Sequence, residues 1–338
     1  MKIIESVPNF SEGQNQSIIN AIAKALSSQK GTKLLDIDSG VEANRTVYSL
    51  IGTEESIGDA LFEGVKIASK LIDLSSHKGT HPRIGALDVC PLIPLYNADL
   101  NDCHKIALKL GKKMWEQLKI PIYLYENSAT TPSRKNLANI RKGEYEGLFE
   151  KLKDPLFTPD FGKAVFNQKS GISVLGARDF LIAYNINISG NLKDAKNIAK
   201  RIRESGYTVM DKNKNPVVIK GLLKSVKAIG WYIEEFKKAQ VSTNIINYKE
   251  TSIFDVFNAV KNEAQKLKIE VTGSELVGMI PLSALTNKVQ DNKNISKNQL
   301  EKNSIFDAIK KLGLSEVKKF DPDKKIIDYR FSLDDFLS

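Results

Sequence analysis

The fold is decided by residues 33–52, which read "KLLDIDSGVEANRTVYSLIG". The two ends of this stretch, 33–38 and 45–52, are rich in the branched aliphatic and aromatic residues that favour strands. The segment between them, 39–44, has the length of a hairpin turn and contains a glycine. The stretch therefore predicts two antiparallel strands that are neighbours in sequence and in space.

The sequence on either side of this hairpin alternates between the period of a helix and that of a strand. Residues 15–28 place apolar side chains at helical spacing, and residues 2–7 before them read as a strand. Residues 54–73 again have a helical period, and residues 86–95 read as the next strand. The resulting order, β-α-β-β-α-β, is that of a ferredoxin-like unit.

The second half of the chain is predicted to repeat this order. Its strands and helices are expected, in turn, at 180–188, 191–205, 217–235, 240–248, 252–268 and 269–278. A helix at 99–118 and a strand at 121–126 are predicted between the halves. A sheet with helices on one face must cover its other face. We therefore expect an α/β protein of the α+β type, in which two ferredoxin-like, mainly antiparallel sheets pack face to face with helices outside.

The boundary between the halves is expected in a loop-rich stretch, residues 153–178, which contains two prolines and several glycines. This divides the chain into a domain at 1–178 and a domain at 179–338. A long ordered loop at such a junction is more often functional than a plain connection.

Composition limits the class of protein. The chain has 338 residues, 41% hydrophobic and 27% charged, which is typical of a globular protein. It has no apolar run of membrane-spanning length and no signal-peptide pattern. With two cysteines and no CxxC motif, a reduced cytoplasmic protein is expected. Its net charge of +10 favours anionic ligands, although a solvated lysine-rich surface, including the Lys/Asn-rich run at 287–303, is an alternative explanation.

Two of the three histidines, His77 and His81, lie in a Gly- and Pro-rich loop before the strand at 86–95. Pro82 restricts His81 to an extended conformation. An imidazole fixed in this way could accept or donate a proton near neutral pH. Two incidental surface histidines are the alternative. His104 lies within a predicted amphipathic helix, where a structural role is expected.

A metal site is not expected near these histidines. Zinc sites use three or four protein ligands, and no third His or Cys lies at a suitable spacing. Asp88 and Cys90 follow on the strand, where strict alternation puts their side chains on one face. The sequence also contains no GxGxxG, GxxxxGK[ST] or GxSxG motif.

Other polar residues lie at strand ends. Asn9 and Ser11 follow the first strand, where Ser11 could simply cap the first helix. Asp38 and Arg45 occupy matching ends of the hairpin strands, and Asn44 directly precedes Arg45. These residues either form an ordinary salt bridge across the turn or line a functional site.

Taken together, several motifs in a fixed order make this sequence resemble the formiminotransferase family. They are "VPNFSEG" (7–13), "NRTVY" (44–48), "SHKGTHPRIGALDVCP" (76–91), "RKGEYEGL" (141–148), "PDFG" (159–162), "GARDFLIAYNIN" (176–187), "GWY" (230–232), "QVSTN" (240–244) and "GSELVGMIPL" (273–282). The resemblance covers about residues 1–285. In animals this domain is fused to a cyclodeaminase; because this sequence stops at Ser338, it is expected to resemble the stand-alone transferase.

The resemblance implies a reaction in histidine degradation. The formimino group would move from N-formimino-L-glutamate to tetrahydrofolate, giving 5-formiminotetrahydrofolate and L-glutamate. Tetrahydrofolate, in cells a folate polyglutamate, would be the co-substrate, and no metal would be required. The family further implies two α/β subdomains and a homodimer, with no nucleic-acid or membrane partner. The alternatives are a related folate enzyme that acts on 5-formyltetrahydrofolate and a basic nucleic-acid-binding protein.

The resemblance also implies the site. The catalytic histidine of the family falls on His81, and the folate-contacting segment falls on 162–171, expected beside the pterin. Within that segment Gly162, Phe166 and Gly171 match the family pattern.

Further roles follow from the chemistry of the reaction. His81 would take the proton from N5 of tetrahydrofolate and pass one to the glutamate nitrogen. Asp38 would be the second catalytic residue, holding the formimino N–H or steadying the imidazolium. Substrate binding is expected at Arg45, through a carboxylate, and at Asn9, Asn44 and His77.

Overall fold

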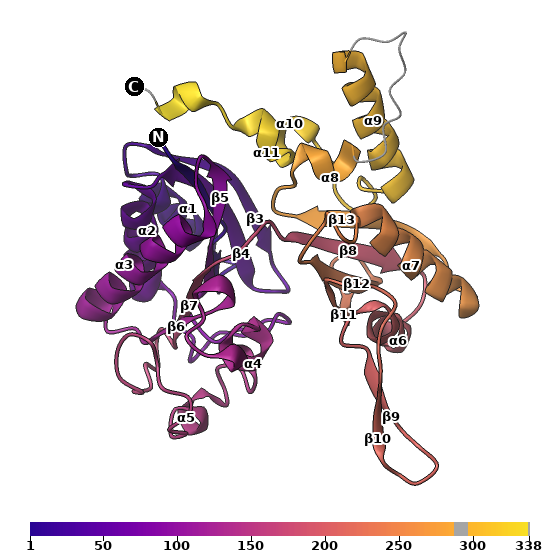
Figure 1. Ribbon diagram of the computed structural model, residues 1–338, viewed down its shortest axis with the longest axis horizontal. Coiled ribbons are helices and arrows are strands. Elements are labelled where there is room, and N and C mark those ends of the chain that lie inside the picture. Colours follow the sequence, from indigo (N-terminus) through magenta and orange to yellow (C-terminus); the bar gives the residue numbers. More distant parts are fainter. Residues whose placement is uncertain (287–296, 337–338) are drawn as a thin grey trace. The chain divides into compact units, whose positions relative to one another are not determined.

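The computed structural model describes residues 1–286 and 297–336. The chain divides into two compact units (Figure 1), Met1–Asp179 with the C-terminal segment from Ser332, and Phe180–Phe331. Each unit combines helices with a mainly antiparallel sheet, so the predicted α+β class is confirmed. The Lys/Asn-rich run at 287–303 lies mostly outside the described residues, and its last part begins helix α9.

The first unit is built on a seven-stranded sheet with the spatial order β3-β4-β1/β2-β5-β7-β6. Its strands are β1 (Ile3–Ser6), β2 (Asn9–Phe10), β3 (Thr32–Gly40), β4 (Arg45–Thr53), β5 (Leu87–Tyr96), β6 (Ile122–Leu124) and β7 (Ser173–Ala177). Its helices are α1 (Gln16–Leu26), α2 (Ile57–Leu71), α3 (Leu100–Leu118), α4 (Leu137–Arg141) and α5 (Leu148–Lys151), with 3₁₀ turns at Glu126–Ser128, Pro132–Arg134 and Leu333–Phe336. The pairings are antiparallel except that β7 runs parallel to β5 and β6.

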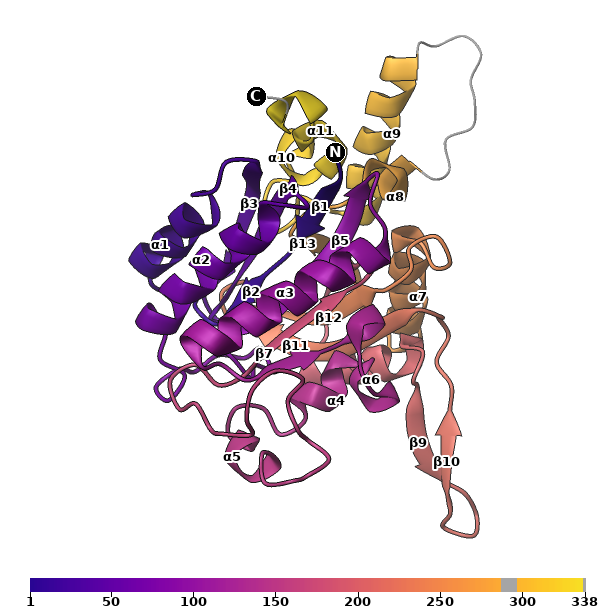
Figure 2. The same cartoon turned by 60° about the vertical axis from the view of Figure 1, so that its left-hand side comes forward.

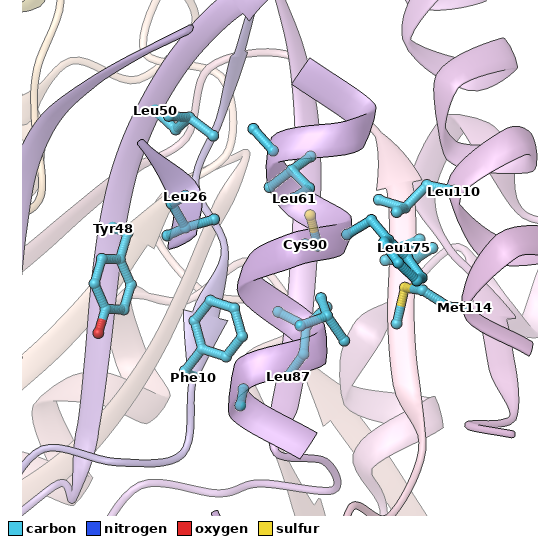
Figure 3. Packing of buried hydrophobic residues seen from close by; sticks show 14 of the residues in the cluster. Phe10, Leu26, Tyr48, Leu50, Leu61, Leu87, Cys90, Leu110, Met114 and Leu175 are labelled. Atoms are coloured by element: carbon cyan, nitrogen blue, oxygen red, sulfur yellow. The ribbon is translucent and has the colours of Figure 1, made fainter. Parts of the chain in front are cut away.

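Helices α1, α2 and α3 cover one face of this sheet (Figure 2). Their apolar stripes meet the inward residues of the strands, so that Phe10 and Tyr48 pack against Leu26 and Leu61 (Figure 3). The Tyr48 hydroxyl is satisfied by donating to Ile19 O at 3.0 Å. The opposite face of the sheet carries no helix of this group, and it is the face on which polar residues gather.

The residue that caps helix α1 is not the predicted Ser11. Asn15 caps α1, since its Oδ1 accepts hydrogen bonds from Ser17 N and Ile18 N. Ser11 instead donates from Oγ to Gly85 O at 2.7 Å. The capping alternative for Ser11 is therefore wrong, and this side chain ties the N-terminal loop to the histidine loop.

The second unit contains a four-stranded antiparallel sheet and a separate two-stranded hairpin. Its strands are β8 (Ile182–Ile188), β9 (Tyr207–Met210), β10 (Pro216–Ile219), β11 (Val226–Ile233), β12 (Lys238–Ile245) and β13 (Val271–Val277). Its helices are α6 (Leu192–Ile202), α7 (Ile253–Lys266), α8 (Leu282–Thr286), α9 (Lys297–Leu312), α10 (Pro322–Lys325) and α11 (Ile327–Arg330). The sheet order β11-β12-β8-β13 matches β3-β4-β1-β5 of the first unit, so the predicted repeat of β-α-β-β-α-β is present.

Two predicted segments differ from the structure. The strand expected at 217–235 is divided, because its first residues form β10 and pair with β9 in a hairpin that extends away from the sheet (Figure 1). Gly221 marks the break, where a Cβ would lie 1.8 Å from Arg203 O. Strand β7 lies inside the stretch predicted as a loop, since a short apolar run between glycines gives little periodic signal.

Candidate active site

A β-bulge in β5 orients the side chain at the centre of the site. Asn9 of β2 faces Val89, and Phe10 faces Leu87, so Asp88 is an extra residue without a partner on β2. Such an extra residue turns its side chain out of the regular alternation of a strand, and bulges of this kind are common beside active sites.

Asp88 is fully buried between two guanidinium groups. Its Oδ2 accepts hydrogen bonds from Arg45 Nη1 at 2.7 Å and Arg141 Nη2 at 2.5 Å, and its Oδ1 accepts one from Ile84 N at 2.9 Å. Burial alone would raise the pKa of Asp88, but Arg141 and Arg45 outweigh it and hold the pKa at about 2. Cys90 belongs to the apolar core, so the prediction that Asp88 and Cys90 share a face is wrong.

The cluster carries one positive charge in excess, because two guanidinium groups share one carboxylate. Burial lowers the pKa of Arg45 to about 10, which leaves this side chain cationic at neutral pH. Arg45 also donates from Nε to Asn9 Oδ1 at 2.9 Å. The ion pair of Arg45 is therefore formed with the buried carboxylate of Asp88, not with Asp38 across the hairpin turn.

His81 is held next to this cluster in a defined tautomer. Its Nδ1 lies 2.7 Å from Pro82 O, and a carbonyl oxygen can only accept, so Nδ1 carries the proton and Nε2 is the basic nitrogen. Burial lowers the pKa of His81 well below its ordinary value. The charges of Arg45 and Arg141 lower it further, while Asp88 opposes them. The ring is therefore neutral at pH 7 and ready to accept a proton.

His77 has a different environment. Its Nδ1 accepts a hydrogen bond from Arg83 Nε at 3.0 Å, and its Nε2 donates to Asn44 O at 2.8 Å. Nδ1 can accept only when it is unprotonated, so these contacts hold the neutral Nε2–H tautomer. Arg83 in turn forms a bidentate ion pair with Glu146, at 2.7 and 2.6 Å. His77 is thus a support for Arg83 rather than a proton carrier.

An open cavity of about 480 Å³ lies beside this ion pair. Its lining residues are His77, Lys78, Gly79, Arg83, Gly143, Glu144 and Glu146. His81 does not belong to this lining. The cavity is therefore lined by residues on either side of His81 in the sequence but not by His81 itself.

The two predicted asparagines support the loops of the site. Asn44 adopts the left-handed conformation with φ of 45°. Its Oδ1 accepts from Gly13 N and its Nδ2 donates to Lys78 O, both at 2.9 Å. Asn9 positions the Arg45 guanidinium, as described above. Both amides are therefore engaged with the protein itself.

Asp38 lies further along the same sheet. It pairs with Val47 on β4, and Val47 pairs on its other side with Asn9 of β2. Because the neighbouring Tyr48 points into the core beneath the helices, Asp38 belongs to the helix-free face. The structure thus gathers Asn9, Arg45 and His81 around Asp88, with Asp38 two strands away from Asn9.

The segment 162–171 is fastened to the histidine loop. Gly171 forms an isolated bridge with Gly85, and Ile172 N donates to Ile84 O at 3.1 Å. Gly171 has a φ of 62°, and a Cβ there would lie 2.2 Å from Ile84 O. Only glycine fits this close approach, so the end of the segment and the histidine loop are held together by backbone contacts.

The other two predicted folate residues, Gly162 and Phe166, each lie against aromatic rings. Gly162 has a φ of 105°, and a Cβ there would lie 2.5 Å from the ring of Trp115. The ring of Phe166 is half-buried, with its centroid 5.6 Å from that of Tyr145 and 5.8 Å from that of Phe149. The segment is therefore shaped by glycine conformation at its ends and by aromatic packing in its middle.

Sequence reasoning missed three charged residues of this site. Asp88 was considered only as a metal ligand, and Arg83 and Arg141 were assigned no role. All three stand inside the motifs at 76–91 and 141–148 that carried the family resemblance. A carboxylate buried between two arginines becomes visible only in the folded structure. There the bulge turns Asp88 out of the strand pattern, and the fold brings the distant segments of Arg45 and Arg141 to it.

Over residues 1–286 and 297–336 we find no group of three or more His, Cys, Asp or Glu arranged to hold a metal ion. Within the same residues, no helix has the length and apolar character needed to cross a bilayer. Cys90 and Cys103 are buried free thiols, and burial raises the pKa of each to about 12.

Comparison with known proteins gives matches over nearly the whole chain. Residues 3–178 match the model of the formiminotransferase domain, N-terminal subdomain, and residues 183–332 match that of the formiminotransferase domain. The chain is 46% identical, over 97% of its length, to the formimidoyltransferase-cyclodeaminase of Dictyostelium discoideum, of which it spans 60%. It is 41% identical, over 84% of its length, to a glutamate formimidoyltransferase of Streptococcus pyogenes, of which it spans 91%. A glutamate formimidoyltransferase of Thermoplasma acidophilum is 36% identical over 89% of the chain and is spanned to 98%.

Proposed function

The chain belongs to the formiminotransferase family, and from this premise we propose that it is a glutamate formimidoyltransferase. It would transfer the formimino group of N-formimino-L-glutamate to N5 of tetrahydrofolate. The products would be 5-formiminotetrahydrofolate and L-glutamate. The observation that carries the proposal is the neutral, tautomer-fixed His81 beside a cluster with an excess positive charge.

The geometry suits a proton shuttle. The lone pair of N5 attacks the formimino carbon, and a new C–N5 bond gives a tetrahedral adduct. His81 Nε2 takes the proton from N5 and delivers it to the glutamate nitrogen, after which the bond between that nitrogen and the formimino carbon breaks. The charges of Arg45 and Arg141 keep the imidazole unprotonated before attack and make the imidazolium a good acid afterwards.

The excess charge of the cluster suits a substrate carboxylate. Arg45 is 7% exposed and is held by Asn9 and Asp88. Arg141 is more accessible, and its Nε is buried without a hydrogen-bond partner among the described residues. A buried N–H group without a partner costs free energy that a bound carboxylate would recover. We therefore place a substrate carboxylate at Arg141 as well as at Arg45.

Folate contacts are proposed at Gly162, Phe166 and Gly171. The backbone of their segment is fastened to the loop that carries His81, which supports a role next to the pterin. Asp38, Asn9, Asn44 and His77 complete the proposed site. The last three act through the loops and guanidinium groups that they hold.

The cellular setting belongs to the same proposal. The enzyme would act in histidine degradation, in the cytoplasm and as a homodimer, and its folate would carry a polyglutamate tail. In this scheme the domain at 1–178 supplies the base and the folate segment, and the domain at 179–338 completes the enzyme. Two buried free thiols agree with a reducing compartment.

A spectroscopic assay of tetrahydrofolate with N-formimino-L-glutamate as donor tests this function. Formation of 5-formiminotetrahydrofolate, with release of one glutamate per turnover, is the expected result. A parallel assay with 5-formyltetrahydrofolate tests the related folate activity. Turnover of that compound in the absence of any formimino transfer would replace the proposed function.

A further inference from the structure

Arg83 closes the loop that carries His81, and the proposed mechanism gives it no role. Its side chain is only 7% exposed. It lies at the end of the loop, where its Nε donates to His77 Nδ1 and its Nη2 donates to His77 O, both at 3.0 Å. His77 lies at the beginning of the same loop. One arginine therefore binds both the ring and the backbone of a residue six positions earlier, and His81 lies between them in the sequence.

The guanidinium of Arg83 is itself held from outside the loop. Glu146 accepts from its Nη1 at 2.7 Å and from its Nη2 at 2.6 Å. The backbone of Arg83 is fixed as well, because its carbonyl oxygen accepts from Tyr145 N at 3.0 Å. The guanidinium carbon lies 5.7 Å from the centroid of the Tyr145 ring. These contacts give the planar fork one orientation, so the turn at 144–146 fixes Arg83 and Arg83 fixes the loop.

The backbone on both sides of His81 is also anchored. Thr80 N donates to Glu42 O at 2.9 Å, and Ile84 N donates to the buried carboxylate of Asp88 at 2.9 Å. Each anchor reduces the number of conformations that the loop can adopt, so the position of His81 depends on all of them. The side chain at position 83 provides the anchor that spans the loop from its beginning to its end.

An ordinary surface ion pair is the alternative explanation for Arg83. Its partner Glu146 is 66% exposed, and ion pairs with such exposure contribute little to stability. The contacts to His77 are of another kind. The ring accepts from Arg83 only as the neutral Nε2–H tautomer, and its Nε2 donates to Asn44 O at 2.8 Å. A fixed tautomer of His77 follows from closure of the loop, whereas an ion pair with Glu146 leaves it unexplained.

We propose that Arg83 is a positioning residue for the general base: by closing the loop on His77, it keeps the imidazole of His81 beside the Asp88 cluster. This inference rests on the proposed function, which makes His81 the base. Misplacement of a catalytic group by about 1 Å can lower the rate about 100-fold, so the effect of Arg83 belongs in kcat. The proposed mechanism places no substrate contact on Arg83, so substrate affinity should change little.

The imidazole of His81 reports its own position, because its pKa depends on burial and on Arg45, Arg141 and Asp88. The chain has three histidines, so proton NMR can follow the titration of each, and replacing one histidine at a time assigns the signals. In Arg83→Gln we expect the pKa of His81 to rise toward its ordinary value of about 6.5, because a released loop exposes the ring to water. This measurement needs no transferase activity.

Arg83→Lys separates position from charge. Loss of a nearby cation would also raise the pKa of an imidazole, but lysine keeps the cation and cannot contact the ring and the carbonyl of His77 together. We therefore expect the pKa of His81 to rise in both variants. Arg203→Gln is the matched control, because Arg203 Nε closes a turn of the second unit by donating to Gly206 O at 2.8 Å. It should leave the pKa of His81 unchanged.

Steady-state kinetics give a second readout. Both Arg83 variants should lower kcat about 10- to 100-fold and leave KM for formiminoglutamate and tetrahydrofolate within about two-fold. The fall of kcat/KM on the acid side should move to higher pH, together with the pKa of His81. Adding His77→Ala to Arg83→Gln should lower kcat little further, because both changes break the same contact. Melting curves check that each variant is folded.

Three outcomes would overturn the role of Arg83. The first is a pKa of His81 that stays at the wild-type value in both folded variants, and the second is a rise in Arg83→Gln alone, which charge would explain. The third is a higher KM with an unchanged kcat, which would make Arg83 a ligand-binding residue of the open cavity that it lines. The fate of the proposed function is read separately. If the wild type transfers no formimino group, that function is wrong, while the NMR titration still shows whether Arg83 positions His81.

Discussion

His81 is the residue to which the proposed mechanism assigns the proton transfer. In that mechanism, replacement by alanine removes the group that moves a proton between N5 and the glutamate nitrogen. We expect kcat to fall by about 10²- to 10⁴-fold, the usual contribution of general acid–base catalysis, with little change in substrate binding. His77→Ala is the control and should do less, because His77 acts only by supporting Arg83. Near-full turnover by His81→Ala, under conditions where chemistry limits the rate, would remove His81 from the mechanism.

The pH profile of the wild-type enzyme tests the same residue. A base works only when it is unprotonated, and the pKa of His81 lies well below its ordinary value because of burial and the nearby arginines. The fall of kcat/KM on the acid side should therefore come clearly below pH 6.5, the region of an unperturbed imidazole. A midpoint at or above that value would contradict the described surroundings of His81.

Arg45 can be tested by a change that keeps its charge. Lysine cannot reproduce the planar fork that contacts Asn9 and Asp88 and would receive a carboxylate. Arg45→Lys should lower kcat/KM for formiminoglutamate by roughly 10- to 150-fold, the equivalent of one charge-assisted hydrogen bond. Because Arg141 still pairs with Asp88, we expect the protein to remain folded, which a melting curve checks. Unchanged kinetics would exclude Arg45 from substrate binding.

Glu5 gives a prediction about stability rather than catalysis. This residue lies in β1 between β4 and β5, is 3% exposed, and has an Oε2 without a hydrogen-bond partner among the described residues. Burial raises the pKa of Glu5 to about 7, although Arg178 opposes this. The folded state therefore binds a proton that the unfolded state has lost above about pH 4.5, and stability decreases as the pH rises from there to about 7.

Glu5→Gln should remove this dependence. The difference in unfolding free energy between pH 5 and pH 8 should shrink by about 2–3 kcal/mol, measured by urea unfolding at both values. Glu116→Gln, at an exposed position on α3, is the control and should leave the difference unchanged. An identical pH dependence in wild type and Glu5→Gln would show that Glu5 is not protonated in the folded protein.

At the level of secondary-structure elements, Gly171 joins the proposed folate segment, 162–171, to the histidine loop. A Cβ at this position would meet Ile84 O, which lies between His81 and the bulge. Gly171→Ala should therefore reduce both folate affinity and kcat, because it displaces both loops at once. Gly31→Ala is a matched control: its φ of 80° imposes a similar backbone strain, but the new Cβ would meet the side chains of Ser56 and Thr53, at 3.1 Å or more, and no backbone atom. If both variants behave alike, backbone strain alone explains the effect.

The same elements show what sequence can and cannot predict. The strands and helices around the first hairpin followed from periodicity, because each buries one face against the core. The bulge at Asp88 did not, since one extra residue leaves no trace in a hydrophobic pattern. Arg141 was missed for a related reason. It lies 53 residues from Asp88 in the sequence, and only the fold brings the two side chains into contact.

At the level of the whole molecule, both units contain the same order of strands although their sequences show no clear identity. The order β3-β4-β1-β5 in one and β11-β12-β8-β13 in the other follows from the same alternation of periods. The polar side chains are not duplicated, because the first unit places His81 and two arginines around Asp88, while the second carries an amide network that ends in a carboxylate. The hydrophobic period predicts the architecture that the two units share. The surroundings of these polar side chains could be known only from their positions in the folded structure.

The net charge of +10 leads to a prediction for the complete enzyme. A positive protein attracts an anionic ligand over a distance set by ionic screening, so the effect grows with the charge of the ligand. Raising the salt from about 0.05 to 0.5 M shortens the screening length from roughly 14 to 4 Å. We expect kcat/KM for tetrahydrofolate polyglutamate to fall several-fold more over this range than kcat/KM for the monoglutamate, while kcat at saturation stays nearly constant. Sucrose, which changes viscosity without screening charge, is the control. Equal salt dependence for the two folates would mean that the excess lysines form only a solvated surface and do not guide the tail.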